Sequence, residues 1–314
     1  MKNDNELRWY QRIVLELLWC LCKLIGWLPR FVRFQLLRPF LGFIFWAVGY
    51  RRKVIMRNLR NAFKDKSDRE IRSIVRRNYL FLAEIAICTI SLASVTPKKD
   101  SDLIQWPNYD EHQRSVAGRD WIAMASHYGC WEYFLMWTWT DQECRMMGVY
   151  HPMRSVVFEH LYRRFRNFSS RIMQVPMAKT IRQYISSRND DSNIAMGLIS
   201  DQSPLLRADT EWIEFLGQPT AFVDGGDKIA RKFHIPAYFV YVDYVEVGRY
   251  AVRFEQIYDG VEEIEDGIIT RRYAERLEKM IRQRPELWLW SHNRWRHTPE
   301  KQAKKFGSTT YRKR

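Results

Sequence analysis

The sequence of 314 residues predicts an α/β fold, with a mixed, mostly parallel central sheet that is flanked by helices. Three observations lead there. Short apolar runs alternate with helix-like stretches along most of the chain, which is typical of α/β domains. A hydrophobic content of 46% lets a chain of this length bury a full core. The N-terminal region, in contrast, is basic, aromatic and helical in its periodicity, so we expect it to lie outside the sheet.

The expected elements follow from these patterns. Strands are predicted at residues 121–125, 145–150, 193–199, 236–244 and 250–257, and helices between them at 131–139, 155–168, 179–188 and 223–233. Upstream, residues 7–30 and 51–63 read as helices. Another helix is expected to begin with a capping box, in which Ser67 is the N-cap and Glu70 the third helical residue, and to reach Leu92. A boundary near residue 95 would divide a basic, amphipathic helical region (1–95) from a larger domain (96–314).

The excess positive charge is confined to the two ends of the chain. Residues 1–60 hold 12 Lys and Arg against 3 Asp and Glu, and residues 301–314 hold 6 against none. The middle, 61–300, is balanced at 33 against 33, so the formal net charge of +15 belongs to the ends. This distribution indicates that the termini face an acidic surface.

The N-terminal basic region is also rich in apolar side chains, which nucleic-acid binding does not explain. On a helix over residues 7–30 the charged residues fall in one stripe about 80° wide. Such a helix lies in a membrane interface more readily than it spans a bilayer. The longest uncharged run, 39–50, has 12 residues, fewer than the roughly 18 of a spanning helix. We therefore expect monotopic attachment to an anionic, cytoplasmic leaflet, with a single spanning helix as the alternative.

Cysteine usage indicates a reducing compartment. The five cysteines (Cys20, Cys22, Cys88, Cys130 and Cys144) are odd in number and have no Cys-x-x-Cys spacing, so neither a disulfide framework nor a zinc site is predicted. Cys130 lies close to His127, but a small buried residue that packs the turn explains it better than a nucleophile.

The segment Ser126-His127-Tyr128-Gly129 follows directly on the apolar run 121–125. A strand there would deliver His127 to the edge of the sheet, and Gly129 permits a tight reversal after it. Glu132 lies five positions after His127, at the expected start of the next helix, where a carboxylate is favoured. An imidazole and a carboxylate that meet across this turn form a general base with its orienting partner.

A second strand end carries a similar signal. Residues 193–199 lead into Ser200-Asp201-Gln202, so Asp201 is delivered to the sheet edge as His127 is, although a turn or cap aspartate has the same pattern. Arg164 is a further candidate, within a helix whose arginines a solvated face also explains. No Gly-x-Ser-x-Gly elbow and no His-Glu-x-x-His motif is present, which argues against an acyl-serine route and zinc hydrolysis.

Several segments together carry a family resemblance. In chain order they are Arg57-Asn58-Leu59 with Ala62-Phe63, His127 to Glu132, Val149-Tyr150 with Pro152, Arg164, Asp201-Gln202, Phe215 to Pro219 with Gly225, and Pro285 to Trp295. With this order and spacing the chain resembles the lipid A biosynthesis acyltransferases, which add lauroyl or myristoyl secondary chains, within the glycerolipid acyltransferase-like superfamily. It departs from that family in His151 and Phe165, where the family usually has an arginine and a glycine.

The resemblance implies an O-acyltransferase that moves a fatty acyl chain from acyl carrier protein to the hydroxyl of a 3-hydroxyacyl chain on a lipid A precursor. No cofactor, metal or nucleic acid is expected, and the location is the cytoplasmic face of the inner membrane. His127 and Glu132 would be catalytic, Arg164 would stabilise the oxyanion or a lipid phosphate, and Asp201 would help hold the acceptor. Two alternatives remain: acylation of a lysophospholipid, aminolipid or glycolipid, or a non-catalytic basic peripheral membrane protein.

Overall fold

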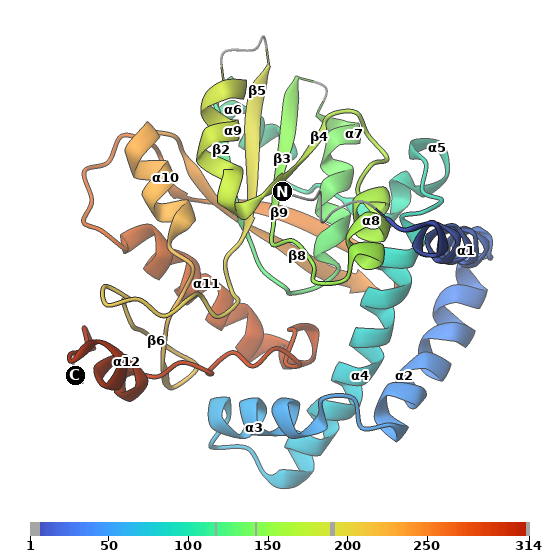
Figure 1. Ribbon diagram of the computed structural model, residues 1–314, viewed down its shortest axis with the longest axis horizontal. Coiled ribbons are helices and arrows are strands. Elements are labelled where there is room, and N and C mark those ends of the chain that lie inside the picture. Colours follow the sequence, from blue (N-terminus) through green and yellow to red (C-terminus); the bar gives the residue numbers. More distant parts are fainter. Residues whose placement is uncertain (1–6, 117, 142, 189–191, 312–314) are drawn as a thin grey trace.

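The computed structural model describes residues 7–116, 118–141, 143–188 and 192–311 and contains a seven-stranded sheet with the order β1-β9-β8-β2-β5-β3-β4 (Figure 1). The strands are β1 (Ile104–Gln105), β2 (Trp121–Ala125), β3 (Cys144–Tyr150), β4 (Ile172–Pro176), β5 (Asn193–Ile199), β8 (Ala237–Glu246) and β9 (Arg249–Tyr258). Neighbouring strands pair in parallel, except β8 with β9. The predicted mixed, mostly parallel sheet is confirmed.

Helices precede the sheet and cover it. The α-helices are α1 (Trp9–Trp27), α2 (Arg38–Ala47), α3 (Arg52–Ala62), α4 (Asp68–Ser91), α5 (Pro97–Asp100), α6 (Tyr109–Val116), α7 (Trp137–Thr140), α8 (Val156–Phe165), α9 (Thr180–Ser187), α10 (Gly225–Phe233), α11 (Ile268–Gln283) and α12 (Pro299–Phe306). A π-helix, η1 (Val32–Leu37), joins α1 to α2, and short 3-10 helices are η2 (Ser101–Leu103), η3 (Trp131–Met136), η4 (Met177–Lys179) and η5 (Pro285–Leu287). A two-stranded hairpin, β6 (Ile213–Phe215) and β7 (Gln218–Thr220), completes the fold.

Strands β2 and β5 form the centre of the sheet. Every residue of β2 is buried, as expected for an apolar strand covered on both faces. The two strands are paired so that Trp121 lies opposite Ala195 and Ala125 opposite Ile199. Since both strands run in the same direction, the residues that follow Ala125 and Ile199 leave the sheet side by side, at its carboxyl end.

The N-terminal region is helical, as predicted. Helix α4 begins with the expected capping box: the Ser67 hydroxyl accepts a hydrogen bond from the Glu70 backbone N–H, and the Glu70 carboxylate accepts one from the Ser67 backbone N–H. Helices α1 and α2 both pack against α4. In Figure 1 they lie along the right side of the molecule, beside α4.

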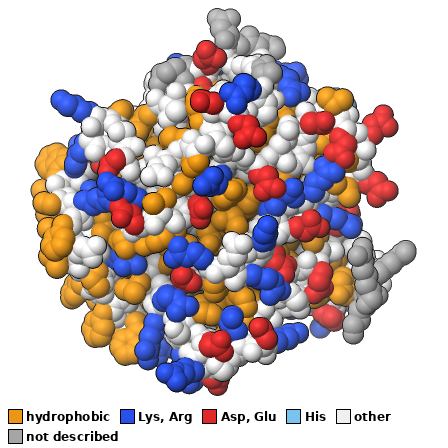
Figure 2. All heavy atoms as spheres, turned by 180° about the vertical axis from the view of Figure 1, so that it is seen from behind, with side chains coloured by type: hydrophobic (Ala, Val, Ile, Leu, Met, Phe, Trp, Pro, Cys, Tyr) orange, Lys and Arg blue, Asp and Glu red, His pale blue; other side chains and the backbone are white. Residues whose placement is uncertain are grey.

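The apolar side of α1, η1 and α2 faces outward. Its exposed large side chains include Trp9, Leu17, Leu24, Trp27, Phe31, Phe40 and Phe43. Hydrophobic side chains gather along the corresponding edge in Figure 2. Two members of the charged stripe pair with the rest of the protein, Glu16 with Arg164 and Arg30 with Asp102 and Glu246, whereas Arg8 and Arg12 are exposed. Among the described residues, none of the helices combines the length and the apolar character needed to cross a membrane.

Most elements expected from sequence are present within a few residues of their predicted limits. Residues 131–139 differ, because they form a 3-10 helix followed by the short helix α7 instead of one α-helix. Strands β1 and β4, the hairpin β6–β7 and helices α5, α6, α11 and α12 were not expected. Strand β4 matters for the site, since it extends the sheet by one strand beyond β3.

Candidate active site

His127 and Asp201 meet just beyond the carboxyl ends of the central strands β2 and β5. Each lies two residues beyond a paired strand end, His127 after Ala125 and Asp201 after Ile199. The Nδ1 atom of His127 is 2.7 Å from Oδ1 of Asp201, and the His127 backbone N–H donates to Oδ2 at 2.9 Å. The parallel register therefore places an imidazole and a carboxylate side by side.

The Asp201 side chain is 2% exposed and is held by three donors. Besides the two groups of His127, the indole Nε1–H of Trp288 donates to Oδ2 at 2.7 Å. Burial opposes ionisation of this carboxyl, but the neighbouring His127 and these hydrogen bonds outweigh burial and lower the pKa of Asp201. An ionised Asp201 accepts a hydrogen bond from Nδ1–H, so Nε2 is the unprotonated nitrogen of a neutral His127.

The Nε2 atom of His127 points towards Gln202, whose amide nitrogen lies 3.1 Å away. The indole ring of Trp131 lies against the other side of the imidazole, with ring centroids 4.8 Å apart. The imidazole thus has a carboxylate on one nitrogen, an amide donor on the other and an aromatic wall beside it. Such an arrangement suits a general base, because its orientation and tautomer are both fixed.

The segment 285–294 holds the loop that carries His127. The Leu289 N–H donates to the His127 carbonyl at 3.1 Å, and the Gly129 N–H donates to the Leu287 carbonyl at 3.0 Å. Gly129 has a φ of +63°, and a Cβ added there would meet the Val242 carbonyl oxygen at 2.4 Å. Glycine is therefore required both by the backbone conformation and by the close approach of β8.

Two asparagines of the N-terminal helices bind this same segment. Asn58 of α3 donates to the carbonyls of Trp290 and His292, at 2.9 and 2.8 Å. Asn78 of α4 donates to the carbonyls of Glu286 and Trp288, both at 2.9 Å. Both asparagine side chains are buried. We call residues 285–294 the C-terminal strap, since they tie the N-terminal helices to the His127 loop.

Glu132 does not contact His127 in this structure, which corrects the expected pairing. Its carboxylate forms a two-point contact with Arg166 instead, from Nε at 2.9 Å and Nη2 at 2.5 Å. Because residues 131–136 form a 3-10 helix, the Glu132 side chain leaves the loop towards α8. Burial alone would lower the pKa of Arg166, but the Glu132 charge and its hydrogen bonds outweigh this and raise it.

Arg164 lies away from this pair. Its guanidinium makes a two-point contact with Glu16 of α1, at 2.8 and 2.5 Å, and lies over the Trp19 ring. Residues two apart near a helix end project to different sides, because each residue turns the helix by about 100°. The arginine that reaches Glu132 is therefore Arg166, whereas Arg164 joins α8 to the N-terminal helix.

An apolar pocket opens beside Glu132 and Arg166. The residues that line it include Trp131, Phe134, Leu135, Met146, Gly148, Val149, Ile172, Gly197 and Leu198. They come from η3 and from β3, β4 and β5, so β4 supplies one wall of the pocket. Trp131 lines the pocket and also touches the His127 ring. A hydrocarbon chain in this pocket would lie next to the imidazole.

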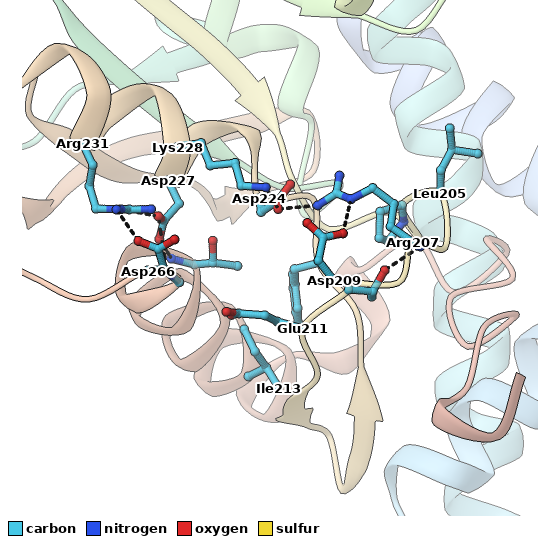
Figure 3. Close-up of a pocket in the computed structure, with 15 residues that line it drawn as sticks. Leu205, Arg207, Asp209, Glu211, Ile213, Asp224, Asp227, Lys228, Arg231 and Asp266 are labelled. Atoms are coloured by element: carbon cyan, nitrogen blue, oxygen red, sulfur yellow. Dashed lines mark hydrogen bonds and ion pairs between the residues drawn. The ribbon is translucent and has the colours of Figure 1, made fainter. Parts of the chain in front are cut away.

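A second, charged pocket lies beyond the loop that carries Asp201 (Figure 3). Arg207 contacts Asp224 at 2.6 Å, and Arg231 contacts Asp227 at 2.8 Å and Asp266 at 2.6 Å. Its arginines are thus already neutralised by carboxylates, and it does not resemble a site for an anionic headgroup.

Two further basic side chains interact electrostatically with Asp201, the partly buried His292 and the buried Arg294. His292 accepts a hydrogen bond from the Ser203 N–H at 3.2 Å, and burial, with Arg294 nearby, lowers its pKa to about 4. Arg294 lies over the Phe222 ring, 4.5 Å from its centroid, and burial lowers its pKa to about 10. His292 is therefore neutral near pH 7 and Arg294 is charged.

The sequence placed His127 and Asp201 at strand ends, but it did not single out Gln202, Trp288, His292, Arg166 or the two asparagines individually. Asn58, Gln202, Trp288 and His292 lie within the segments that carry the family resemblance. Asn78 and Arg166 have no signal in the sequence that separates them from surface residues.

The family described as bacterial lipid A biosynthesis acyltransferase matches residues 1–297. The chain belongs to this family. No curated protein matches it closely enough to count as a relative. This acyltransferase of lipid A biosynthesis therefore takes a lipid as its acceptor, and its family indicates association with a membrane.

Proposed function

We propose that this acyltransferase adds a secondary acyl chain to a lipid A precursor, with Nε2 of His127 taking the proton from the acceptor hydroxyl. The observation that carries the proposal is the His127–Asp201 pair beside an apolar pocket. Transfer from a thioester to a hydroxyl needs a base, stabilisation of the oxyanion and exclusion of water. The described residues offer a group for each of these needs.

The reaction balances without a further co-reactant. The hydroxyl oxygen of a 3-hydroxyacyl chain attacks the thioester carbonyl while its proton moves to Nε2 of His127. The carbonyl carbon gains a C–O bond and loses its C–S bond, and the imidazolium returns the proton to the leaving thiolate. Asp201 stabilises the imidazolium through Nδ1, at 2.7 Å.

Oxyanion stabilisation is assigned to the amide of Gln202 and to Arg166. The acceptor hydroxyl must displace the Gln202 amide, 3.1 Å from Nε2, before Nε2 can take its proton, and the displaced amide is then free to donate to the developing oxyanion. Arg166 contributes a guanidinium to the lining of the pocket, and Glu132 fixes it with two contacts. Glu132 thus acts through Arg166, and Arg164 fastens α8 to α1.

The apolar pocket is the proposed site of the donor acyl chain. Gly148 and Gly197 face each other on β3 and β5 and contribute no side chain to its wall. Glu132 and Arg166 are the charged members of its lining, beside which the thioester carbonyl would lie, and the remaining lining is mostly apolar. This division matches an acyl thioester, whose reactive carbonyl stands at one end of a hydrocarbon chain.

The proposed location is the cytoplasmic face of the inner membrane, and the proposed donor is acyl carrier protein. The outward apolar side of α1, η1 and α2 would enter the interface and let the enzyme draw its lipid acceptor from the bilayer. A basic chain with a net charge of +15 is attracted to an anionic leaflet and to an acidic carrier.

The test is acyl transfer by purified, detergent-solubilised protein from acyl carrier protein to a lipid A precursor, followed by mass spectrometry of the lipid. We expect one added acyl chain with the wild type. His127→Ala should lower kcat about 10²- to 10⁴-fold, the usual worth of general base catalysis. Turnover of His127→Ala at the wild-type rate would contradict the proposal.

Two controls sharpen this test. His234→Asn changes an exposed histidine at the end of α10, where φ is +52° and Asn is tolerated, so its rate should match the wild type. Lipid from a host strain without the gene, with and without restored protein, identifies the acceptor. If the acyl chain is missing from a lipid other than lipid A, the proposed acyl-transfer reaction stands, but that other lipid is the acceptor.

A further inference from the structure

The loop that follows Gln202 has almost no backbone hydrogen bonds of its own. This loop, residues 203–212, begins directly after the glutamine whose amide nitrogen lies 3.1 Å from Nε2 of His127. Within the described ranges, its backbone forms one backbone–backbone hydrogen bond, from the Thr210 N–H to the Arg207 carbonyl at 3.3 Å. Backbone groups that no helix or sheet pairs must find other partners. The shape of the 203–212 loop therefore depends on side chains from elsewhere in the chain.

The C-terminal strap and the residues just after it hold the near end of this loop. The Ser203 N–H donates to Nε2 of His292 at 3.2 Å. Two positions beyond the strap, Arg296 donates from Nη2 to the carbonyls of Ser203 and Pro204, at 3.2 and 3.4 Å. These bonds anchor the loop where it leaves the active site, but they end at Pro204. The rest of the loop needs another support.

One buried side chain of α12, that of Gln302, supports the far end of the loop. Gln302 is 0% exposed. Its Nε2 donates to the carbonyls of Arg207, Ala208 and Thr210, at 3.1, 2.9 and 3.2 Å. A side-chain amide has two hydrogens to donate, so three carbonyls share its whole donor capacity. Gln302 thus satisfies the acceptors that the loop leaves open.

The oxygen of the Gln302 amide is bound as fully as the nitrogen. Its Oε1 accepts from Nε1 of Trp212 at 2.8 Å, from the Thr309 hydroxyl at 2.7 Å and from the Thr310 N–H at 3.2 Å. The Thr310 hydroxyl also donates to the Thr210 carbonyl. Carbonyls at one end and donors at the other fix the orientation of the amide. Gln302 therefore fastens the loop to the residues that follow α12.

This support lies beyond the residues that match the family. The match covers residues 1–297, and α12 begins at Pro299. In Figure 1 α12 lies at the lower left, close to β6, into which the 203–212 loop leads. The part of the chain that matches the family thus contains the loop, but not Gln302, which holds its far end.

The amide of Gln202 needs a fixed backbone more than its neighbour Asp201 does. Three donors hold the Asp201 carboxylate in place. Among the described residues, the Gln202 amide has His127 as its one hydrogen-bond partner. When the acceptor hydroxyl takes that position, no described side chain holds the amide. Its place is then set by the backbone that carries it and by the loop that follows.

We propose that Gln302 is a positioning residue for acyl transfer: by fixing the 203–212 loop, it keeps the amide of Gln202 where the oxyanion develops. The proposal rests on the function proposed above, and it adds a residue of the C-terminal helix that does not touch the substrates. Gln302 acts through the backbone of the loop and leaves the His127–Asp201 pair as it is. Its loss should therefore weaken oxyanion stabilisation alone.

The first test is Gln302→Met, which keeps the length of the side chain and removes every hydrogen bond of its amide. We expect kcat for acyl transfer to fall about tenfold, because a displaced donor costs less than the roughly 10²- to 10³-fold loss of a whole oxyanion donor. KM for both substrates and the acid limb of the kcat/KM profile should stay at the wild-type values, since the His127–Asp201 pair and the apolar pocket are unchanged. A wild-type kcat in Gln302→Met would overturn the proposal.

A double-mutant cycle separates positioning from a loss of folded protein. Gln202→Ala removes the amide itself and should lower kcat by about 10²-fold. If Gln302 acts through Gln202, adding Gln302→Met to Gln202→Ala lowers kcat no further. A smaller fraction of folded protein would instead lower kcat by the same factor in both backgrounds, and that result would overturn the positioning role.

Tyr184→Phe is the matched control for the loss of a buried hydrogen bond. Tyr184 is 1% exposed, and its hydroxyl donates to Asp120 at 2.8 Å. Asp120 directly precedes β2, so this contact lies at the opposite end of the strand from His127. The control should lower stability and keep the wild-type kcat. A tenfold fall of kcat in Tyr184→Phe would assign the effect of Gln302→Met to stability and overturn the proposal.

Hydrogen exchange separates this proposal from the proposed function, because it needs no turnover. The N–H groups of Arg207 and Thr210 are hydrogen-bonded within the turn that Gln302 holds. In the full-length, detergent-solubilised chain, Gln302→Met should speed exchange of peptides that cover this turn at least about tenfold and leave β2 unchanged. Faster exchange would support the hold on the loop even if the wild type transferred no acyl chain, which would refute only the function. Unchanged exchange would overturn the role of Gln302.

Discussion

His112 and His127 show how strongly burial changes one type of side chain. His127 has a carboxylate on Nδ1, whereas His112 lies among aromatic rings, with the Phe254 ring centroid at 4.1 Å and those of Trp121 and Tyr238 at 4.4 and 4.5 Å. Among the described residues, neither ring nitrogen of His112 has a hydrogen-bond partner. Burial lowers the pKa of His112 to about 3. His112 is thus a neutral core residue. Of these two histidines, His127 is the one placed for chemistry.

This difference predicts how the free energy of unfolding depends on pH. In the unfolded chain His112 binds a proton below a pKa near 6.5, but in the folded chain it stays neutral down to about 3. The unfolded state therefore binds more protons between these values, and His112 makes stability fall as the pH falls, by up to about 1.4 kcal/mol per unit.

We expect His112→Phe to weaken this dependence, because phenylalanine fits the aromatic surroundings and takes up no proton. Urea unfolding in detergent at pH 7, 6 and 5 measures it, with His234→Asn as the exposed control. An acid dependence in His112→Phe as steep as in the wild type would show that His112 does not cause it.

The sequence predicted where the site residues lie along the chain better than it predicted which side chains contact each other. His127 and Asp201 were both expected at strand ends, because an apolar run followed by polar turn residues marks such an end. Their pairing depends on the register of β2 against β5, two strands about 70 residues apart, and a parallel register leaves no local signal. Glu132 was paired with His127 from proximity in sequence, whereas the 3-10 helix directs it to Arg166.

At the scale of elements, the C-terminal strap connects parts of the chain that are far apart. Asn58 and Asn78 bind its carbonyls from α3 and α4, and Trp288 extends from it to Asp201. Each asparagine satisfies two backbone acceptors, which would be costly to leave without partners inside the protein. This explains why asparagines, and not apolar residues, lie at these buried helix positions.

Trp288→Phe tests whether the strap tunes Asp201. Phenylalanine keeps the aromatic ring, and it removes the indole N–H that donates to Oδ2 at 2.7 Å and helps to lower the pKa of Asp201. That pKa should rise, so more alkaline conditions are needed to keep Asp201 ionised. We expect kcat to fall about tenfold, as for a lost hydrogen bond to a charged group. The acid limb of the kcat/KM profile should move to higher pH.

A purely structural role for Trp288 would lower stability without moving the acid limb. Trp290→Phe is the matched control, because its indole donates to the Pro285 carbonyl within the strap and not to Asp201. The control should therefore leave the pH profile in place. An equal shift of the acid limb in both variants would contradict the role assigned to Trp288.

The elements themselves were predictable where their pattern was strong. Strands β2 and β5 are apolar runs between turn residues, and α4 carries a complete capping box. Strand β4 contains Gln174 and ends in Pro176, so its five residues do not read as a strand without β3 beside them. Helix α11 was left out although its buried residues, from Ile269 to Ile281, have helical spacing, because charged residues fill the positions between them.

At the scale of the whole molecule, the apolar side of α1, η1 and α2 suits a lipid interface. The contact of Glu16 with Arg164 joins α1 to α8, whose end carries Arg166 beside the pocket. The division into regions 1–95 and 96–314 stays a prediction. The sequence indicated an amphipathic first helix, but not that Glu16 and Arg30 of its charged stripe would pair with distant parts of the protein.

We expect the protein to attach to membranes through the outward apolar side of α1. Leu17 and Leu24 lie seven residues apart on the outward side of α1, and both are exposed. Leu17→Asp with Leu24→Asp places charge where hydrocarbon is expected, and burial of one leucine is worth about 1.5–3 kcal/mol. Binding to anionic vesicles, measured by co-sedimentation, should therefore fall at least about 100-fold. Turnover of detergent-dispersed substrate should persist, since both leucines face outward and pack against no other part of the core.

The control places the same charges on other exposed apolar residues. Val261→Asp with Phe306→Asp changes the loop after β9 and the end of α12, so vesicle binding should stay at the wild-type level. Equal losses in both pairs would mean that net charge, and not the apolar side of α1, sets the affinity. Unchanged binding in Leu17→Asp with Leu24→Asp would show that another surface binds the membrane. The reason is that burying two carboxylates in the membrane costs too much free energy for α1 to remain embedded.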